Sequence, residues 1–172
     1  MVDWVRLRLD VDAFDEREFE PCADQARESG VRFASLAELG DTEAHRRALY
    51  ELNKECSADI PERGEFHTYD EYVARRLDVP TFDPAGVILA LRDGEWIGMS
   101  ATSLHPADGS AFSEMTGVRA PYRGRRLSLA LKLHAIRFVR AAGHRWLVAY
   151  HHPRNAAAIA MNRRLGFADF EP

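Results

Sequence analysis

The stretch VRAPYRGRRLSLALK, residues 118–132, decides the fold of this chain. Three arginines surround Gly124 immediately before a run whose apolar residues recur at helical spacing. The first N–H groups of a helix lack partners within the helix, and the helix dipole places about half a positive charge there. Two interpretations follow, a site that binds an anion such as phosphate or a solvated basic turn.

The charge of the chain is uneven along its length. The net charge is −4, but residues 115–168 contain eleven Lys and Arg and no Asp or Glu. These residues therefore carry +11, and the rest of the chain carries −15. A basic segment of this kind indicates a nucleic acid, a phosphorylated small ligand or an acidic face of the same protein as its partner.

Composition limits the class of protein. The 172 residues, 46% of them hydrophobic, suit one folded domain and not a disordered segment. No apolar run approaches the roughly 18 residues that span a bilayer, and the N-terminus lacks a signal-peptide pattern. Cys22 and Cys56 have no zinc-ligand spacing. We therefore expect a cytoplasmic protein without a metal and without a membrane partner.

Hydrophobic periodicity predicts one α/β domain with a mixed sheet. Alternation predicts strands over residues 4–10, 31–36, 87–91, 96–104, 111–118 and 145–150, with a last strand starting at Phe167. Helical spacing predicts helices over residues 13–29, from an Asp41 cap onward, behind a Thr68–Glu71 capping box, over 125–142, and from Asn155 to Gly166. Residues 93–94, Asp-Gly, predict a hairpin.

Two further motifs reveal a family resemblance. TGVRAPYRGRRLSLALK, followed by HPRNAAAIAMNRRLGF, resembles the GNAT superfamily of acyl-CoA-dependent N-acyltransferases. These proteins hold the pyrophosphate of coenzyme A with the backbone of a (Gln/Arg)-x-x-Gly-x-(Gly/Ala) turn, here residues 123–128, and have a later Asn-bearing helix that ends in Leu-Gly-Phe, here residues 155–167. The resemblance covers about residues 31–170. It implies the α/β GNAT fold, a mixed and mostly antiparallel sheet flanked by helices, with acetyl-CoA as acyl donor.

The N-terminal residues resemble the junction inside tandem, mycothiol-synthase-like GNAT proteins. We therefore divide the chain into a strand-helix extension, residues 1–30, and a GNAT domain, residues 31–172. In tandem members the opening strand is the last strand of the preceding domain. We expect residues 4–9 to complete the sheet, within the chain or swapped across a homodimer, because an unfilled sheet edge invites pairing.

The resemblance also implies the residues that hold the acyl donor. Arg126 occupies the second glycine position of the turn, where it either hinders the phosphate or swings out and adds a cationic contact. Asn162 stands where many GNAT enzymes place a tyrosine that protonates the leaving thiolate. The expected cofactor-binding residues are Thr116, Gly117, Val118, Arg123, Gly124, Arg125, Arg126, Leu127, Ser128, Asn155 and Asn162.

The implied reaction is direct attack of an amine on a thioester, which needs a base, an acid and a donor to the thioester oxygen. Strand alternation places Glu114 on the face of Thr116 and makes it the candidate base, the alternative being a surface carboxylate paired with an arginine or a neighbouring strand. Tyr150 and His151 are candidate acids or solvent-exposed strand-end residues. A backbone N–H near residues 117–118 is the expected oxygen donor.

The acceptor is the remaining component. Residues 57–67 contain Asp59, Glu62, Glu65 and His67, and lie where GNAT proteins usually shape the acceptor pocket. Their acidity suits a cationic amine, and a solvated loop is the alternative.

Three functions compete on these grounds. The first is transfer of an acetyl or other short acyl group from acyl-CoA to an amine of a small molecule. The second is a CoA-binding, catalytically inactive GNAT-like regulatory or structural protein. The third is nucleic-acid binding, which the sequence disfavours because neither a stacking platform nor a recognition helix is evident.

Overall fold

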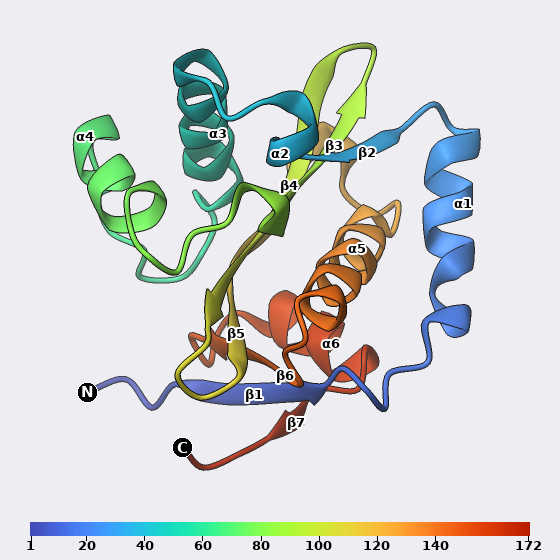
Figure 1. The fold of residues 1–172 in the computed structure, drawn as a ribbon, viewed down its shortest axis with the longest axis vertical. Coiled ribbons are helices and arrows are strands. Elements are labelled where there is room, and N and C mark those ends of the chain that lie inside the picture. Colours follow the sequence, from blue (N-terminus) through green and yellow to red (C-terminus); the bar gives the residue numbers. More distant parts are fainter.

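A seven-stranded sheet in the order β2-β3-β4-β5-β6-β1-β7 organises residues 1–172 in the computed structural model (Figure 1). Only the pair β5–β6 is parallel, and the other neighbouring pairs are antiparallel. This sheet confirms the predicted mixed, mostly antiparallel α/β fold. The strands are β1 Val5–Asp10, β2 Arg32–Ser35, β3 Val87–Arg92, β4 Glu95–His105, β5 Ser110–Val118, β6 Trp146–His151 and β7 Ala168–Asp169.

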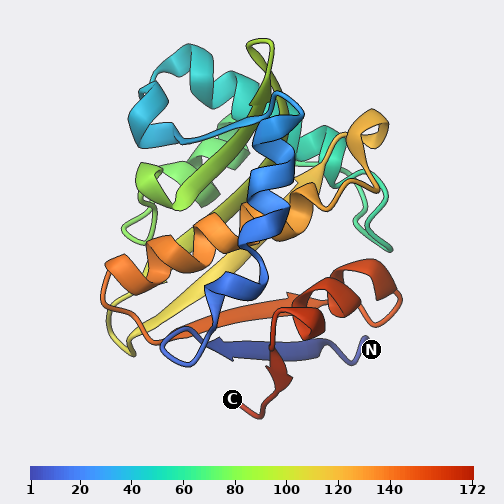
Figure 2. The same cartoon turned by 90° about the vertical axis from the view of Figure 1, so that its right-hand side faces the viewer.

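Helices cover both faces of the sheet. α3 and α4 lie on one face, and α1 and α5 lie on the other (Figures 1 and 2). The α-helices are α1 Glu20–Glu28, α2 Leu36–Leu39, α3 Glu43–Cys56, α4 Tyr69–Tyr72, α5 Leu127–Ala141 and α6 Ala156–Arg164. The short turns are η1 Glu16–Glu18, η2 Val73–Leu77, η3 Pro84–Gly86 and η4 Ala120–Tyr122, of which η2 is a π-helical turn that continues α4. No helix has the length and apolar character needed to cross a membrane.

Local signals set most helix ends. The Thr68–Glu71 capping box and the Asn155 N-cap are both present as predicted. The prediction that Asp41 caps α3 is wrong, because Thr42 accepts the N–H of His45 while Asp41 binds Arg46.

The first helix is shorter than the predicted span of residues 13–29. α1 begins only at Glu20, with Pro21 in its first turn. Proline lacks an N–H group and is therefore tolerated at the start of a helix but not in its interior. A separate turn, η1, occupies residues 16–18.

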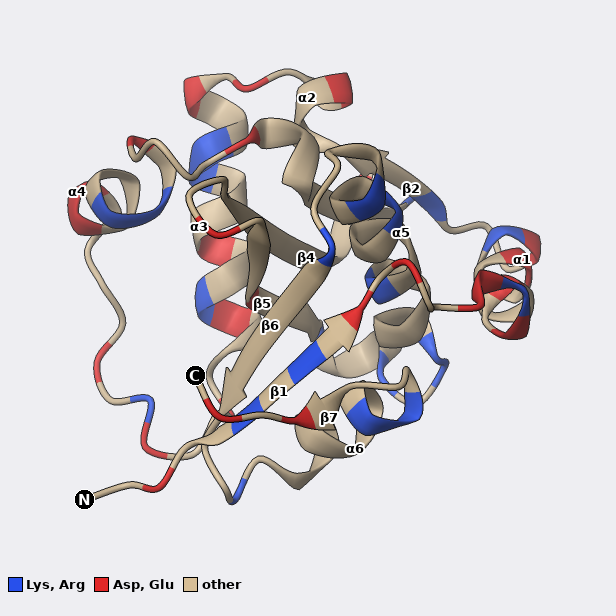
Figure 3. Ribbon diagram, turned by 60° about the horizontal axis from the view of Figure 1, so that its bottom comes forward, with Lys and Arg blue, Asp and Glu red and all other residues tan.

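The N-terminal strand β1 lies between β6 and β7 of the same chain. Leu7 and Leu9 are buried in the core on one face, while Arg6 and Arg8 lie on the other, where the Arg8 guanidinium is 4.1 Å from the ring centroid of Trp146. Figure 3 shows these basic positions along β1. Residues 4–9 thus complete the sheet in cis in this structure, and their exchange between two copies stays a prediction.

Most basic residues of the segment 115–168 form ion pairs with acidic residues from other parts of the chain. Seven of its eleven basic residues form them, namely Arg119, Arg123, Arg137, Arg140, Arg145, Arg154 and Arg163. Exposed pairs of this kind stabilise a fold by only about 0–1 kcal/mol each. Their main consequence here is to neutralise charge, and they leave Arg125 and Arg126 without an acidic partner at the turn before α5.

Candidate functional site

β5 and β6 diverge shortly after they meet, which opens the sheet at its centre. Their parallel pairing joins only Ser110, Ala111 and Phe112 to residues 146–148. Beyond that point β5 pairs only with β4, and β6 pairs only with β1. The backbone edge of residues 113–118 that faces β6 is therefore available to a ligand.

A β-bulge at Glu114 sets the direction of the side chains around this opening. Thr102 pairs with Ser113 and Ala101 with Met115, so Glu114 is an extra residue in β5. The prediction that alternation places Glu114 and Thr116 on one face is wrong, because the bulge shifts the alternation by one residue. Glu114 and Thr116 consequently line different cavities.

The opening between β5 and β6 contains a cavity of about 340 Å³, here called the splay cavity. Six residues predicted to bind the cofactor line it, namely Thr116, Gly117, Val118, Arg123, Ser128 and Asn155. Further walls come from Asp59 and Ile60, which belong to the segment predicted to shape the acceptor pocket, and from residues that the sequence did not indicate, namely Cys56, Met115, Ala157, Ala158 and Met161. The cavity thus joins the end of α3, strand β5, the start of α5 and helix α6.

Two details of these walls bear on chemistry. A Cβ atom on Gly117 would lie 2.7 Å from Cβ of Cys56, so glycine is what allows α3 to pack against β5 here. Burial raises the pKa of the Cys56 thiol to about 11. The thiol therefore stays protonated at neutral pH and is a poor nucleophile.

The turn before α5 presents unused N–H groups. The backbone N–H groups of Gly124 through Leu129 donate to no acceptor in the chain. Gly124 and Arg126 both have a positive φ, which turns the backbone sharply into the helix. Free N–H groups at the start of a 15-residue helix, beside two unpaired arginines, form a site for an anion. This arrangement favours the anion site over the solvated turn.

The arginines of the turn differ in their surroundings. Arg123 lines the splay cavity and contacts the carbonyl oxygen of Val118 at 3.0 Å and Asp59 at 2.8 Å. Arg125 lies instead over the ring of Tyr122, and Leu127 is buried in the core. Arg126 is exposed, with φ 60° and ψ 20°, so an arginine holds the left-handed backbone that the family's glycine adopts readily.

We expect Arg126→Gly to leave folding stability within about 1 kcal/mol, because relief of the left-handed strain offsets the entropy of glycine. Loss of the cationic side chain should weaken binding of acetyl-CoA, the donor that the resemblance implies, by roughly threefold to tenfold, more at low salt than at high salt. Calorimetric titration at two salt concentrations measures this difference. Tighter binding by the glycine variant would show instead that the arginine obstructs the phosphate.

Asn162 and His151 form a hydrogen-bonded pair, and neither is among the residues that line the splay cavity. Their Nδ2 and Nε2 atoms are 2.6 Å apart, and Asn162 is 1% exposed. Burial, together with the positive charge of Lys132, lowers the pKa of His151 to about 4. The imidazole is therefore neutral near pH 7 and does not act there as an imidazolium acid.

Lys132 is a buried amine that no sequence motif in α5 indicates. It is 1% exposed and donates a hydrogen bond of 2.7 Å to the Ser113 hydroxyl. Burial alone lowers the pKa of Lys132 to about 7. Because no carboxylate compensates the charge of the protonated amine, Lys132 makes the free energy of unfolding depend on pH.

Lys132→Met should raise the free energy of unfolding near pH 7 by on the order of 3 kcal/mol. The lowered pKa of Lys132 reduces the free energy of unfolding of the wild type by on the order of 4 kcal/mol near pH 7. The variant recovers this free energy but loses about 1 kcal/mol with the hydrogen bond to Ser113. The unfolded chain binds the proton more tightly than the folded chain, so wild-type stability rises with pH from about 7 to the unfolded value near 10.5.

Urea unfolding of both proteins near pH 7 and near pH 10 tests this expectation. The advantage of the methionine variant should largely vanish at the higher pH. The same pH slope in both proteins would contradict the assignment of a buried lysine whose pKa is lowered because its charge is uncompensated.

Tyr150 lies away from the splay cavity. Its side chain is on the opposite face of β6, 40% exposed, between Phe112 and Phe170 and near the guanidinium of Arg6. Strand alternation explains this position, because neighbouring Ala149 is buried in the core. The geometry therefore corrects the assignment of Tyr150 as an acid at this site.

Two more cavities lie on the α3–α4 side of β5 and share Asn53, Tyr72, Arg76 and Glu114. One, here called the side cavity, has a volume of about 210 Å³ and meets the splay cavity at Ile60 and Met115, which line both. The other, here called the apolar cavity, has a volume of about 50 Å³. A molecule in the side cavity would thus lie next to one in the splay cavity.

Glu114 occupies the boundary of these two cavities. One carboxylate oxygen accepts a hydrogen bond of 2.8 Å from Ser103, and the other is paired with Arg76. The ion pair matches the alternative that the sequence left open for Glu114. Its place on the cavity wall also leaves the carboxylate beside any ligand that enters.

The acidic segment 57–67 divides between the cavities. Asp59 and Arg123 line the splay cavity and pair with each other, while Glu62 pairs with His152 and Arg154. Glu65 and His67 line the side cavity. Asp59 and Glu62 are thus paired with basic residues, which leaves Glu65 as the carboxylate of this segment on the wall of the side cavity, and an acidic acceptor pocket stays a prediction.

Comparisons with known proteins agree with this geometry. The description "Acetyltransferase (GNAT) family" belongs to a sequence profile that matches residues 46–167. A protein named mycothiol acetyltransferase, from Streptomyces avermitilis, is 37% identical over 120 residues, which cover 70% of this chain and 38% of the relative. The chain thus spans less than half the length of this curated relative.

Solved structures support the fold at lower identity. A GCN5-related N-acetyltransferase from Sphaerobacter thermophilus matches with a TM-score of 0.68 and 20% identity, over 98% of this chain and 49% of the other. A tandem GNAT protein from the clavulanic acid biosynthesis pathway matches with a TM-score of 0.66 and 18% identity, over 99% and 51%. These matches establish the arrangement of the elements.

Proposed function

Because this chain belongs to the acetyltransferase (GNAT) family, we propose that it transfers an acetyl or other short acyl group from acyl-CoA to an amine of a small molecule. The observation that carries the proposal is the splay cavity, whose walls include residues 116–118 on the unpaired backbone edge of β5 and Ser128, one of the residues with a free N–H at the start of α5. The relative named mycothiol acetyltransferase supports a small-molecule acceptor.

The acyl donor fits the residues that surround this cavity. The N–H groups of residues 124–129, with Arg123 and Arg126, would hold its pyrophosphate. Asn155, which caps α6, and the walls from Met115 and Met161 would line its pantetheine arm. When bound, acetyl-CoA supplies the activated acetyl group, and a backbone N–H near residues 117–118 would face the thioester oxygen.

The acceptor amine would enter through the side cavity and meet the donor at Ile60 and Met115. Glu114 would take the proton from the incoming ammonium group, directly or through water. Asn162 and His151 would polarise the region of the leaving sulfur as neutral hydrogen-bonding groups. The proposal thus gives the two sides of β5 separate tasks, the donor on one and the acceptor on the other.

One observation favours a second candidate, a CoA-binding protein without turnover. Neither the Asn162 amide nor the neutral His151 carries a proton that is readily released to a thiolate near pH 7. Proton supply would then depend on solvent or on another group. Binding of acetyl-CoA without any turnover is the result that would select this candidate.

Release of free thiol from acetyl-CoA across a panel of small amines tests the proposed activity. We expect release that depends on both protein and amine, with a mass increase of one acetyl group on the amine. A protein that binds acetyl-CoA but releases no thiol with any amine would rule out the enzyme and leave the second candidate.

The proposal extends to the setting of the protein. Cys22 and Cys56 are unpaired and buried, which supports a reducing, cytoplasmic compartment.

Exchange of β1 between two copies would make a homodimer through the same pairings with β6 and β7. Sedimentation of the purified chain tests the dimer.

A further inference from the structure

Positive charge outweighs negative charge around the side and apolar cavities. Three arginines, Arg63, Arg75 and Arg76, lie on their walls, against two carboxylates, Glu65 and Glu114. Only Arg76 and Glu114 form an ion pair with each other, and Arg75 has none. An acceptor that carries an anionic group beside its amine would therefore find a cation to bind.

Arg63 is held without a carboxylate. Its guanidinium donates to the carbonyl oxygen of Lys54 at 2.9 Å, to the carbonyl oxygen of Gly64 at 3.2 Å and to the Ser57 hydroxyl at 3.1 Å. These are neutral partners, so the positive charge of Arg63 is not cancelled within the protein. It adds to the positive potential of the side cavity.

Arg76 and Glu114 present a positive and a negative charge next to each other, as a binding site for a zwitterion requires. The side chains of Arg76 and Glu114 are 39% and 24% exposed, so both charges are open to a ligand at the shared boundary of the two cavities. A ligand with adjacent ammonium and carboxylate groups could replace this internal pair, with its carboxylate on Arg76 and its ammonium on Glu114. The ammonium would then face the proposed base.

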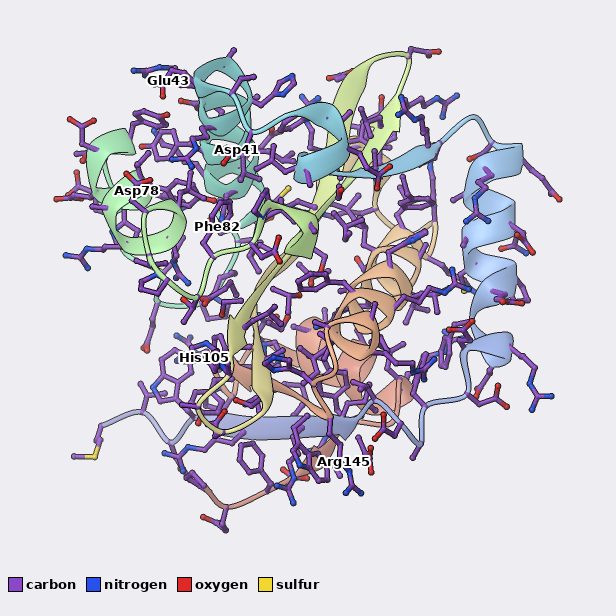
Figure 4. The ribbon with its side chains drawn as sticks, viewed as in Figure 1. Asp41, Glu43, Asp78, Phe82, His105 and Arg145 are labelled. Atoms are coloured by element: carbon purple, nitrogen blue, oxygen red, sulfur yellow. The ribbon has the colours of Figure 1, made fainter.

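The apolar cavity lies beside this pair and suits a short hydrocarbon group. Its walls include Leu49, Leu77, Val79, Phe82 and Val87, and its volume is about 50 Å³. Ion pairs connect the two sides of this cavity, because Arg46 of α3 binds both Asp41 and Asp78, and Asp78 lies between the wall residues Leu77 and Val79. Figure 4 shows Asp41, Asp78 and Phe82 gathered between α3 and the segment that follows α4.

We propose that the acceptor is a free α-amino acid with a short aliphatic side chain. This inference rests on the proposed function and names its substrate class. The aliphatic group fills the apolar cavity, the carboxylate binds Arg76, and Glu114 takes a proton from the ammonium group. The neutral nitrogen then forms a bond to the acetyl carbon as the carbon–sulfur bond breaks, and the second proton that the nitrogen loses passes to the departing thiolate, directly or through water, which gives an N-acetyl amino acid and the thiol of coenzyme A.

Calorimetric titration of the protein saturated with coenzyme A tests the inference without turnover. The probes are L-valine, L-valinamide and isobutylamine, which keep the aliphatic group and the amine while only valine has the carboxylate. We expect a dissociation constant for valine at least tenfold below those of the other two. Equal affinity for the three probes, tighter binding of valinamide, or no binding of valine at millimolar concentration would overturn the inference.

Variants of Arg76 locate the carboxylate. Arg76→Gln should weaken valine binding at least tenfold and leave the other two probes within about twofold, and Arg76→Lys should recover part of the loss. Arg164→Gln removes an exposed arginine that forms no ion pair and serves as the control of equal charge. A loss that is the same for all three probes would contradict the role of Arg76.

Thiol release from acetyl-CoA separates this inference from the proposed function. Release with amines that lack a carboxylate, together with weak valine binding, would leave the function standing and overturn the inference. Tight, Arg76-dependent valine binding without release would overturn the proposed function and leave a binding site for the amino acid in place of an acceptor site.

Discussion

Replacement of Glu114 by glutamine is expected to lower the rate of acetyl transfer by about 10²–10⁴-fold, the usual contribution of a general base. The substitution keeps the size of the side chain and the contact with Ser103 but removes the group that accepts a proton from the amine. Acetyl-CoA binding should not change, because Glu114 lines the side and apolar cavities and not the splay cavity. Steady-state kinetics and calorimetric titration measure the two quantities separately.

The fold should tolerate this change. The Arg76 side chain is 39% exposed, so water solvates its charge once the carboxylate is gone. Glu51→Gln, an exposed position on α3 without an ion pair, is the matched control. Full activity in Glu114→Gln would remove Glu114 from the mechanism, and loss of acetyl-CoA binding would show that the two sides of β5 are not separate sites.

Substitution of Gly124 by aspartate is expected to weaken acetyl-CoA binding by at least about 100-fold, which removes roughly 2.7 kcal/mol of ligand stabilisation. The new carboxylate would lie among the N–H groups proposed to hold the pyrophosphate and would repel it. The backbone at Gly124 has φ 78°, which strains any side chain, but an added Cβ meets nothing within 4 Å, so no neighbouring atom blocks the carboxylate. Thermal melting with and without acetyl-CoA measures the loss.

Gly94 offers a matched control for this variant. It lies in the β3–β4 hairpin with φ 77° and equally open surroundings, so Gly94→Asp imposes the same strain away from the site. Both variants should lose about 1 kcal/mol of folding stability. Only Gly124→Asp should lose the response to acetyl-CoA, and an equal response in the two variants would place the pyrophosphate elsewhere.

The sequence was sufficient for the fold and for the turn before α5 that we propose holds the donor, because both depend on local signals. Gly124 with its flanking arginines marks the helix start, and Asn155 caps α6 where an N-cap residue was predicted. The capping box at Thr68 and the Asp-Gly hairpin are equally local. Each of these features is complete within a few residues of chain.

The rest of the site depends on contacts between distant segments. The bulge at Glu114 arises from its register with β4, which alternation within β5 does not reveal. The pairing of Glu62 with His152 joins residues 90 positions apart and draws acidity out of the predicted acceptor pocket. Lys132 has no local signal at all, since its burial follows from the packing of α5 on the sheet.

The central claim is that the splay cavity binds acetyl-CoA, and thermal melting of the unmodified chain with acetyl-CoA tests it most directly. At about a hundred times the dissociation constant, the ligand should add roughly 2.7 kcal/mol, which corresponds to a rise in melting temperature of roughly 5–10 °C for a chain of this length. Pantetheine, which lacks the pyrophosphate, should give a much smaller rise at the same concentration. An unchanged melting temperature at millimolar acetyl-CoA would contradict the account.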